Sequence, residues 1–270
     1  MKKKIVQKLF EINKNLFCIH SFPNIEELRF YKKKVIEEAK KILEHKFAIL
    51  GSGEIFLGKK INWHKDFKSG YVWPLEHYTV LKMEDFKDNS DQKVPWELSR
   101  FHHFTTLGKA YLLTGDEIYT NEFKKQFEDW CKNNPYEFGI NWACAMEVAI
   151  RAINLIVAFY FFKNSKILDD KFWLEYFKNL YLHGEYIHKN LEWDVVNTNH
   201  YLSDIAGLFF LGDFFKLDKK GQKWYKFAKE ELEKEIRNQV YSDGVDIEAS
   251  INYHRLVTEL FLLCFLHSSK

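Results

Sequence analysis

From Pro95 onward, the chain is built almost entirely of long helical segments separated by short breaks. Apolar residues recur with helical spacing over seven segments, at 96–114, 117–133, 142–163, 169–191, 198–215, 220–240 and 248–267. Turn-forming residues such as Gly115-Asp116 and Asp243-Gly244 separate these segments. Long helices with short connections pack as antiparallel neighbours. No fixed-period repeat indicates a TPR or HEAT array, so the sequence predicts an all-α fold, an incomplete α/α toroid of antiparallel helix hairpins.

The first 94 residues have a different character. Residues 25–45 show helical periodicity with abundant Lys and Glu. Between 47 and 74, glycines interrupt short apolar stretches such as EIFLG, which predicts a looped segment with short strands. We expect residues 1–94, with this helix and looped segment, to pack on a toroid formed by 95–270. The toroid is expected to be one structural unit with no second domain after its last helix.

The composition is that of a folded protein with a large core. Of the 270 residues, 46% are hydrophobic and 17% are aromatic, which is too apolar for a disordered chain. The aromatic excess has two interpretations, a core between large helices or rings that stack on sugars or bases. The 40 basic residues nearly balance the 38 acidic ones, so no global field predicts nucleic-acid binding.

The sequence predicts neither a membrane segment nor a cofactor. The N-terminus lacks the apolar stretch of a signal peptide, and the longest apolar run, 152–162, is too short to span a bilayer. We therefore expect a soluble, cytoplasmic protein. Cys18, Cys131, Cys144 and Cys264 form no CxxC pair, so we expect reduced thiols, with Cys144 and Cys264 packed in the core. No HExxH, GxGxxG or Walker motif is present, so no metal and no nucleotide is predicted.

The segment 142–163 is apolar almost all round, apart from one polar stripe. Glu147, Arg151 and Asn154 are spaced i, i+4 and i+7, which puts them on one face of a helix. Because a helix that is apolar on its other sides is buried, this stripe must face water or be paired internally. An ion pair between Glu147 and Arg151 that braces neighbouring helices is the simpler interpretation.

The apolar segment 198–215 is preceded by a polar cluster. The cluster comprises Asn197, Thr198, Asn199 and His200, with Asp204 following on the same face. A helix N-cap accounts for Asn197 or Thr198, but not for the whole cluster. Asn199 and His200 fall in the first turn, where free N–H groups and the helix dipole favour an anion. An amide beside this helix end is suited to receive a carboxylate, while His200 is equally well explained by capping or packing.

The last segment carries a third polar stripe. Its members are Glu248, Asn252, Arg255 and Glu259, with Tyr253 and His254 among them. A tyrosine beside a histidine and an arginine is a candidate base, because nearby positive charge lowers the pKa of a phenol. The alternative is a tyrosine at a helix interface whose hydroxyl is satisfied.

Four segments together resemble the N-terminal domain of the heparinase II/III-like polysaccharide lyases. They are PWELSRFHHFTTLGKAYLLTGDEIY (95–119), NPYEFGINWACAMEVAIRAINLI (134–156), NTNHYLSDIAGLFFLG (197–212) and QVYSDGVDIEASINYHRLVTEL (239–260). The segment 50–74 also resembles the loop that precedes the toroid in this family. The resemblance covers most of the chain and rests on the ordered set of motifs. It implies an incomplete α/α toroid, followed in the family by a β-sandwich domain that this sequence lacks.

The resemblance implies β-elimination on a polysaccharide that contains uronic acid. By motif position, it implies that Asn199 neutralises the uronate carboxylate and that Tyr253 is the base at C5. A further catalytic histidine normally comes from the β-sandwich domain, so that role is unfilled in this sequence. Arg151, His200 and His254 are expected to supply positive potential near Tyr253.

The resemblance also places the helix after Pro95 along the cleft. Arg100, His102 and His103 form a polar cluster there, and because neighbours on a helix differ by about 100 degrees, one histidine is expected to face inward. Trp96, Trp142 and Trp193 lie near predicted helix ends, and we expect at least one to stack on a sugar. The candidate substrate-binding residues are therefore His200, His254, Arg151, Glu147, Arg100, His102, Trp142 and Trp96.

Together these features predict a polysaccharide lyase-type domain that acts on an acidic polysaccharide or oligosaccharide and is incomplete without a C-terminal domain. Two alternatives stay open. A glycoside hydrolase of the α/α-toroid type needs two carboxylates that flank the bond, for which Glu147, Asp204, Glu248 and Glu259 are available. A non-catalytic toroid would bind acidic carbohydrate without cleaving it. The product separates lyase from hydrolase, because only a lyase forms an unsaturated uronate that absorbs ultraviolet light.

Overall fold

The computed structural model of the protein describes residues 2–13, 25–82 and 89–268. The helices are α1 (Lys2–Ile12), α2 (Ile25–Leu43), α3 (Lys93–Ser99), α4 (His102–Thr114), α5 (Glu117–Asn133), α6 (Ala145–Phe162), α7 (Asp170–Lys189), α8 (Asn199–Phe214), α9 (Lys219–Gln239) and α10 (Ile251–Ser268). An antiparallel hairpin pairs β1 (Lys46–Ala48) with β2 (Glu54–Phe56), inside the predicted looped segment. Cys131, Cys144 and Cys264 are free thiols, whereas Cys18 lies outside the described residues.

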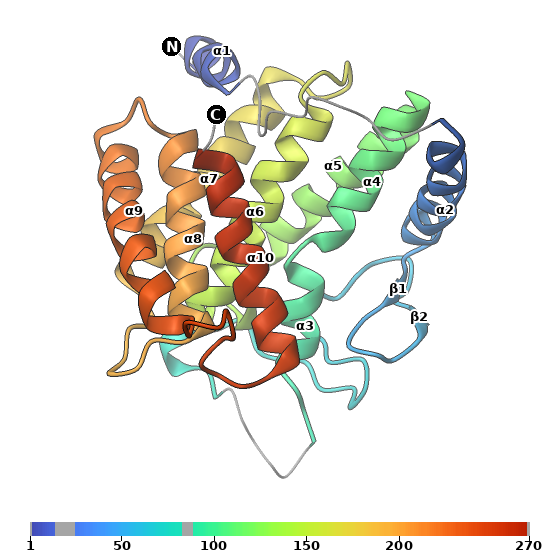
Figure 1. Ribbon diagram of the computed structural model, residues 1–270. Helices are drawn as coiled ribbons and strands as arrows, with labels where there is room; N and C mark the ends of the chain where they lie inside the picture. The colour runs from blue at the N-terminus through green and yellow to red at the C-terminus, as the bar shows by residue number, and fades with distance from the viewer. Residues whose placement is uncertain (1, 14–24, 83–88, 269–270) are drawn as a thin grey trace.

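The helices form an inner and an outer series (Figure 1). In the inner series, α2, α4, α6, α8 and α10 are neighbours in that order, and in the outer series α5, α7 and α9 pack against α4, α6 and α8. Each outer helix carries the chain back, so α4, α6, α8 and α10 run parallel and begin at the same end of the molecule, at the bottom of Figure 1, whereas α2 begins at the opposite end. The predicted all-α class and incomplete α/α toroid are confirmed.

Two kinds of connection alternate around the toroid. Short turns lead from an inner helix to the next outer helix, at 115–116, 163–169 and 215–218. Longer return segments lead from an outer helix to the next inner helix, at 134–144, 190–198 and 240–250. Because each return segment ends where an inner helix begins, these segments surround the N-terminal ends of the inner helices.

The predicted helix 96–114 is wrong in one respect, because the structure divides it into α3 and α4. The break is at Phe101, whose φ of 64° lies in the left-handed region that bulky residues rarely adopt. Burial stabilises this conformation, since the Phe101 ring is fully buried, stacks on Phe104 with centroids 4.3 Å apart and contacts Trp130 edge-on. Arg100 and His102 consequently stand on either side of the break.

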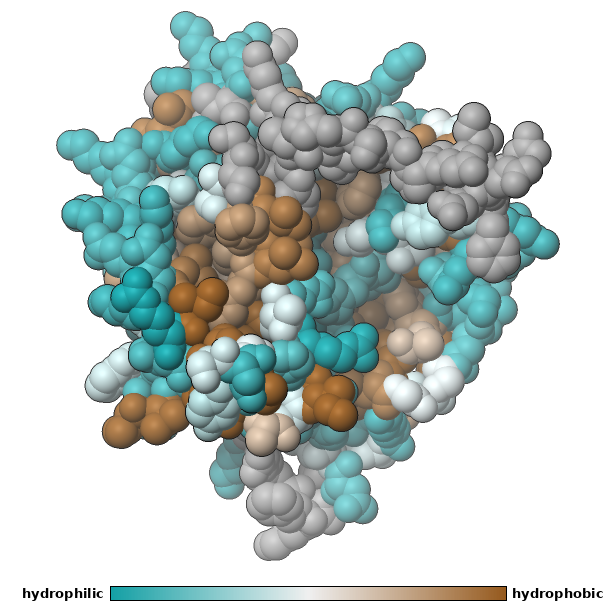
Figure 2. All heavy atoms as spheres, in the orientation of Figure 1, coloured by the Kyte–Doolittle hydropathy of each residue, from teal (hydrophilic) through white to brown (hydrophobic). Residues whose placement is uncertain are grey.

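The last predicted helix also begins later than expected. It starts at Ile251 rather than at residue 248, because Ala249 has a left-handed φ of 50° that interrupts helical geometry. Glu248 therefore lies in the return segment and not on the polar stripe predicted for this helix. The rest of α10 lies at the surface, with Ile251, Leu262 and Leu266 exposed, and Figure 2 shows apolar side chains reaching the surface on this face.

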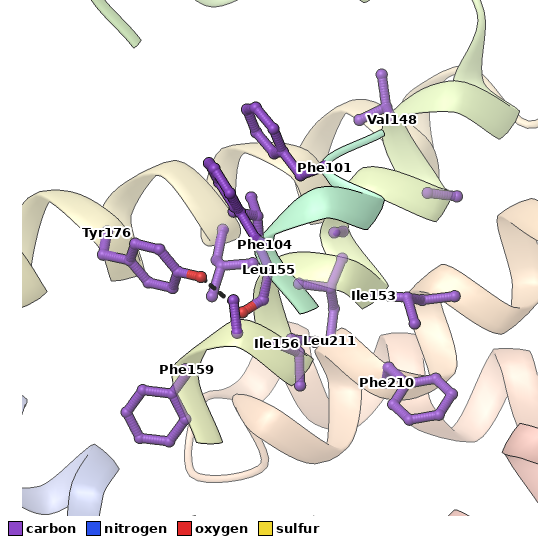
Figure 3. Close-up of a cluster of buried hydrophobic side chains, with 14 of the residues drawn as sticks. Phe101, Phe104, Val148, Ile153, Leu155, Ile156, Phe159, Tyr176, Phe210 and Leu211 are labelled. Atoms are coloured by element: carbon purple, nitrogen blue, oxygen red, sulfur yellow. Dashed lines mark hydrogen bonds between the residues drawn. The ribbon is translucent and has the colours of Figure 1, made fainter. Parts of the chain in front are cut away.

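Large aromatic side chains fill the space between the inner and outer helices. Phe101, Phe104, Phe159 and Tyr176 belong to one buried cluster (Figure 3). The Tyr176 hydroxyl in this cluster donates a hydrogen bond to the Leu155 carbonyl at 2.6 Å, so its polar end is satisfied. These buried rings favour the interpretation that the high aromatic content serves a core between large helices.

The apolar helix α6 belongs to this core. Its 18 residues are long and apolar enough to cross a membrane, but 78% of this stretch is buried inside the protein. A helix that is apolar all round and enclosed by other helices is the central element of a large core.

The segment before residue 95 shares the same core. Val35 and Ile42 of α2 pack in it beside α4, and α1 packs against α7. Trp63 is buried in the looped segment, and its indole N–H donates to Asp129 Oδ2 of α5 at 2.8 Å. One continuous hydrophobic core therefore joins the N-terminal segment to the helices that follow it.

Helix α8 is buried along nearly its whole length. It packs against α6, α7, α9 and α10. At Gly207 it meets α6 so closely that an added Cβ would lie 2.7 Å from the Cβ of Ala149. The glycine therefore sets the separation of α6 and α8.

Gly207→Ala is expected to lower the free energy of unfolding by about 1–3 kcal/mol, the usual cost of forcing an extra methyl group into a packed core. Urea unfolding followed by circular dichroism measures this change. Ala149→Gly is the matched partner, because it removes the methyl group that the new Cβ would meet. The double variant should lose less stability than the sum of the two single variants. Additive losses would show that this contact does not limit the helix separation.

Candidate functional site

The N-terminal ends of the inner helices gather most of the predicted site residues. His102 begins α4, Glu147 lies in the first turn of α6, Asn199 and His200 begin α8, and Tyr253 lies in the first turn of α10. Each helix start presents free N–H groups and a partial positive charge. The surface on this side of the molecule is hollowed beside α10 (Figure 2). Negatively charged groups are therefore favoured at this end of the toroid.

The first residue of α8 binds a carboxylate that belongs to the chain itself. The Asn199 backbone N–H donates to Glu248 Oε1 at 2.8 Å, and the Asn199 amide donates to both Glu248 oxygens, at 2.8 and 2.9 Å. Asn199 is only 3% exposed. The chemistry expected of Asn199, an amide at a helix end that receives a carboxylate, is therefore present, with Glu248 as its partner.

Tyr253 lies on the neighbouring inner helix. It is 44% exposed, so a ligand can reach it. Helices α8 and α10 pack together and begin at the same end of the molecule, which places Tyr253 and Asn199 on adjacent helix ends. His254 Nδ1 accepts a hydrogen bond from the Asp246 N–H at 3.3 Å, so this ring holds the return segment that carries Glu248.

His200 is paired with Glu192, a residue in the return segment before α8. Its Nδ1 is 3.3 Å from Glu192 Oε1, and this hydrogen bond raises the pKa of His200 above its usual value. Glu192 Oε2 accepts the Met146 N–H of α6 at 2.8 Å, and the Cys144 thiol lies 3.6 Å from both Glu192 oxygens. Three potential metal ligands, from Cys144, Glu192 and His200, thereby come within 4.8 Å of one another.

The predicted ion pair between Glu147 and Arg151 is wrong, because Glu147 pairs with Arg100. Arg100 donates Nε to Glu147 Oε2 at 2.6 Å and Nη2 to Oε1 at 2.7 Å, and its Nη1 donates to Glu97 at 2.8 Å. Burial disfavours the charged form of Arg100, but its bonds to Glu147 and the charge of Glu97 outweigh this and raise its pKa. This pair braces the break between α3 and α4 against α6.

Arg151, which the sequence predicts to bind substrate, lies in the interior of the protein. It is fully buried, with its guanidinium 4.6 Å from the Trp130 ring and 5.4 Å from the Trp142 ring. Its Nε donates to His183 Nε2 at 2.9 Å. Burial lowers the pKa of Arg151 to about 9, so the group stays charged at neutral pH and is stabilised by the two aromatic faces. Its guanidinium is therefore covered in this structure.

The two tryptophans predicted to bind substrate also fill the interior. Trp142 is fully buried beside Arg151, and Trp96 is 7% exposed, with its indole N–H donating to the Ile140 carbonyl at 2.7 Å. Neither ring is open to a sugar, because the core needs both for packing. Trp193 differs, since it lies in the return segment before α8 and is 70% exposed.

The adjacent histidines at the start of α4 have different surroundings. His102 is exposed and, with Glu97, lines a pocket of about 500 Å³ between α2, the hairpin and α3. His103 hydrogen-bonds Gln126 Oε1 of α5 at 2.9 Å. Burial lowers the pKa of His103 to about 3, which keeps this ring neutral and structural. His102 remains the candidate for contact with a ligand.

The sequence did not predict Glu192 as a site residue, nor its contact with Cys144. Glu192 lies in a segment without periodicity, 48 residues from Cys144. Glu248 was expected on a helix face, whereas it lies before the helix and caps a different one. The position of Glu192 before a predicted helix could have indicated it, because acidic side chains in such segments can bind the positively charged start of a helix.

Glu248→Ala removes the carboxylate at the start of α8 and is expected to lower the free energy of unfolding by about 1–3 kcal/mol, the range for charged hydrogen bonds. Added acetate should restore part of the lost thermal stability, because it can take the vacated place at Asn199. Thermal unfolding in acetate, compared with chloride at equal ionic strength, measures this. The control is Glu248→Ala combined with Asn199→Ala. An equal acetate effect in the double variant would show that Asn199 does not hold the anion.

Comparison with known proteins identifies the family. Residues 8–268 match the family model described as Heparinase II/III N-terminus. A heparin-sulfate lyase of Pedobacter heparinus is 28% identical over 235 residues, covering 85% of this chain and 32% of the relative. A heparin-sulfate lyase of Bacteroides stercoris is 31% identical over 192 residues, covering 63% of this chain and 28% of the relative. This chain therefore spans about a third of the length of these relatives.

Solved structures share the toroid. The crystal structure of heparan sulfate lyase HepC from Pedobacter heparinus matches with a TM-score of 0.72 at 25% identity, covering 99% of this chain and 39% of that one. The Heparinase III-BT4657 gene product matches with a TM-score of 0.64 at 25% identity, covering 88% of this chain and 36% of that one. Because the family model spans nearly the whole sequence and these structures share its fold, the chain belongs to the heparinase II/III family of polysaccharide lyases, in the N-terminal region of that family.

Proposed function

We propose that this chain is the toroid part of a lyase that cleaves a uronic-acid-containing polysaccharide by β-elimination. The relatives named above are heparin-sulfate lyases, which supports an acidic polysaccharide as the substrate class. The observation that carries the proposal is the carboxylate held by Asn199 at the start of α8.

A uronate presents the same chemical group as Glu248. Both are planar carboxylates that can accept the Asn199 amide and backbone N–H together. In the proposed complex, the sugar carboxylate replaces Glu248, which moves aside with its return segment. This neutralisation matters because removal of the C5 proton places a second negative charge next to the carboxylate, and hydrogen bonds aimed at that charge stabilise the transition state.

Tyr253 is the proposed base and acid. As a tyrosinate it takes the proton from C5, the C4–O bond breaks as the C4–C5 double bond forms, and the phenol then returns the proton to the leaving glycosidic oxygen. Its exposure and its place beside the start of α8 support this role. His102 and Trp193, both exposed, are proposed to contact neighbouring sugar units.

The resemblance assigns a further catalytic histidine to a β-sandwich domain that follows the toroid in the family. Activity is therefore proposed for the complete gene product, in which such a domain would complete the cleft. The toroid contributes the carboxylate site and the tyrosine.

The test is elimination of heparan sulfate by the complete gene product, followed by the ultraviolet absorbance of the unsaturated uronate. Tyr253→Phe should lower the rate by about 10²–10⁴-fold, the usual contribution of general acid–base catalysis, while binding of the polysaccharide is kept. Asn199→Ala should lower kcat by about 10²–10³-fold, as for loss of one oxyanion donor. Tyr241→Phe, an exposed tyrosine in the return segment before α10, is the matched control and should retain activity.

Two outcomes would overturn the proposal. New reducing ends without the chromophore would identify a hydrolase that uses two carboxylates. Binding of heparan sulfate without turnover, and with equal affinity in Asn199→Ala, would identify a carbohydrate-binding toroid that does not use the carboxylate site.

A further inference from the structure

We propose that Cys144, Glu192 and His200 form a binding site for a zinc-type divalent cation. The three residues come from three parts of the chain. Cys144 precedes α6, Glu192 lies in the return segment before α8, and His200 is in the first turn of α8. Their ligand atoms, a thiol sulfur, a carboxylate oxygen and an imidazole nitrogen, all lie within 4.8 Å of one another.

The distances between these atoms fit a tetrahedral site. With Zn–S of about 2.3 Å and Zn–N and Zn–O of about 2.0–2.2 Å, neighbouring ligand atoms of a tetrahedron lie roughly 3.3–3.7 Å apart. The Cys144 sulfur is 3.6 Å from Glu192 Oε1, and His200 Nδ1 is 3.3 Å from the same oxygen. Two edges of the site thus already have the required length.

The carboxylate is held in place for this role. Glu192 Oε2 accepts the Met146 N–H at 2.8 Å, and the Glu192 backbone N–H donates to Asp204 Oδ2 at 2.8 Å. These bonds fix the side chain and the backbone of Glu192 and leave Oε1 as the oxygen that meets the other two ligands. Bonds of this kind around a ligand orient it and strengthen metal binding.

The carboxylate of Glu192 has no arginine or lysine partner among the described contacts of this site. Glu147 is paired with Arg100, whereas the positively charged partner of Glu192 is His200. A bound divalent ion would compensate the charge of Glu192 and take the place of the Cys144 thiol proton, which is released to water.

The arrangement leaves one position open. Cys144 is buried, whereas the side chains of Glu192 and His200 are 30% and 47% exposed. A site with three protein ligands and access for water on one side is typical of catalytic zinc. Without a metal, the Cys144 thiol donates a weak hydrogen bond to Glu192; a bound cation would replace that proton.

The cation site does not depend on the proposed lyase activity, so it is tested by binding alone. Metal-free protein is titrated with Co²⁺, a spectroscopic substitute for Zn²⁺. One equivalent should bind per chain and give sulfur-to-cobalt charge-transfer absorption with the intense visible bands of four-coordinate cobalt, and Zn²⁺ should remove both. Cys144→Ser should abolish the sulfur band and weaken binding by at least about 100-fold, since loss of a supporting group alone costs 10–100-fold.

Cys264→Ser is the matched control, because Cys264 is a buried thiol of α10 outside the cluster, and it should bind Co²⁺ like the wild type. A cobalt spectrum without a sulfur band, a sulfur band that persists in Cys144→Ser, or no binding of Co²⁺ and Zn²⁺ at equimolar concentrations would each overturn the proposal.

A second measurement on the wild-type protein avoids any folding defect of the variants. Zn²⁺ should slow alkylation of Cys144 by a small reagent at least tenfold, as read by mass spectrometry, without protecting Cys131 or Cys264. Equal labelling of Cys144 with and without Zn²⁺ would overturn the proposal.

Discussion

The enclosure of α8 by other helices is the constraint on which the rest of the structure depends. It is packed against α6, α7, α9 and α10, and Gly207 allows the close contact with α6. A helix in this position meets other groups mainly at its ends, and its C-terminal end turns directly into α9. Its N-terminal turn is therefore the part of the central helix that is available for chemistry, and the polar residues Asn199 and His200 stand there.

Carboxylates of the chain occupy the positive ends of the inner helices. Glu192 accepts an N–H at the start of α6, and Glu248 accepts one at the start of α8, as expected where helix dipoles add to free N–H groups. Glu147 is held in the same region by Arg100. In the proposed function, an acidic ligand would not meet an empty basic groove. It would exchange with an internal anion, so that the net charge of the proposed site would change little on binding.

Apolar periodicity predicted the helices well where turn residues bound them, as for α5 and α9, whose ends differ from 117–133 and 220–240 by at most one residue. The break at Phe101 could not be predicted, because a left-handed φ at phenylalanine depends here on the rings of Trp63 and Trp130, which come from other parts of the chain. Spacing predicted Arg151 on one polar stripe with Glu147, but it could not show that tryptophans enclose Arg151 while Glu147 pairs with Arg100. The contact of Cys144 with Glu192 joins segments without a shared motif.

Because short turns alternate with long return segments, sequence changes in the return segments and sequence changes between the helices affect different properties of the protein. The return segments carry Glu192, Trp193 and Glu248 to the end where the inner helices begin, whereas the short turns lie at the opposite end. An insertion or replacement in a return segment can reshape the proposed ligand-binding surface while the helices keep their neighbours. Substitutions between the helices alter stability instead. Ligand specificity and thermodynamic stability can therefore change independently among proteins with this fold.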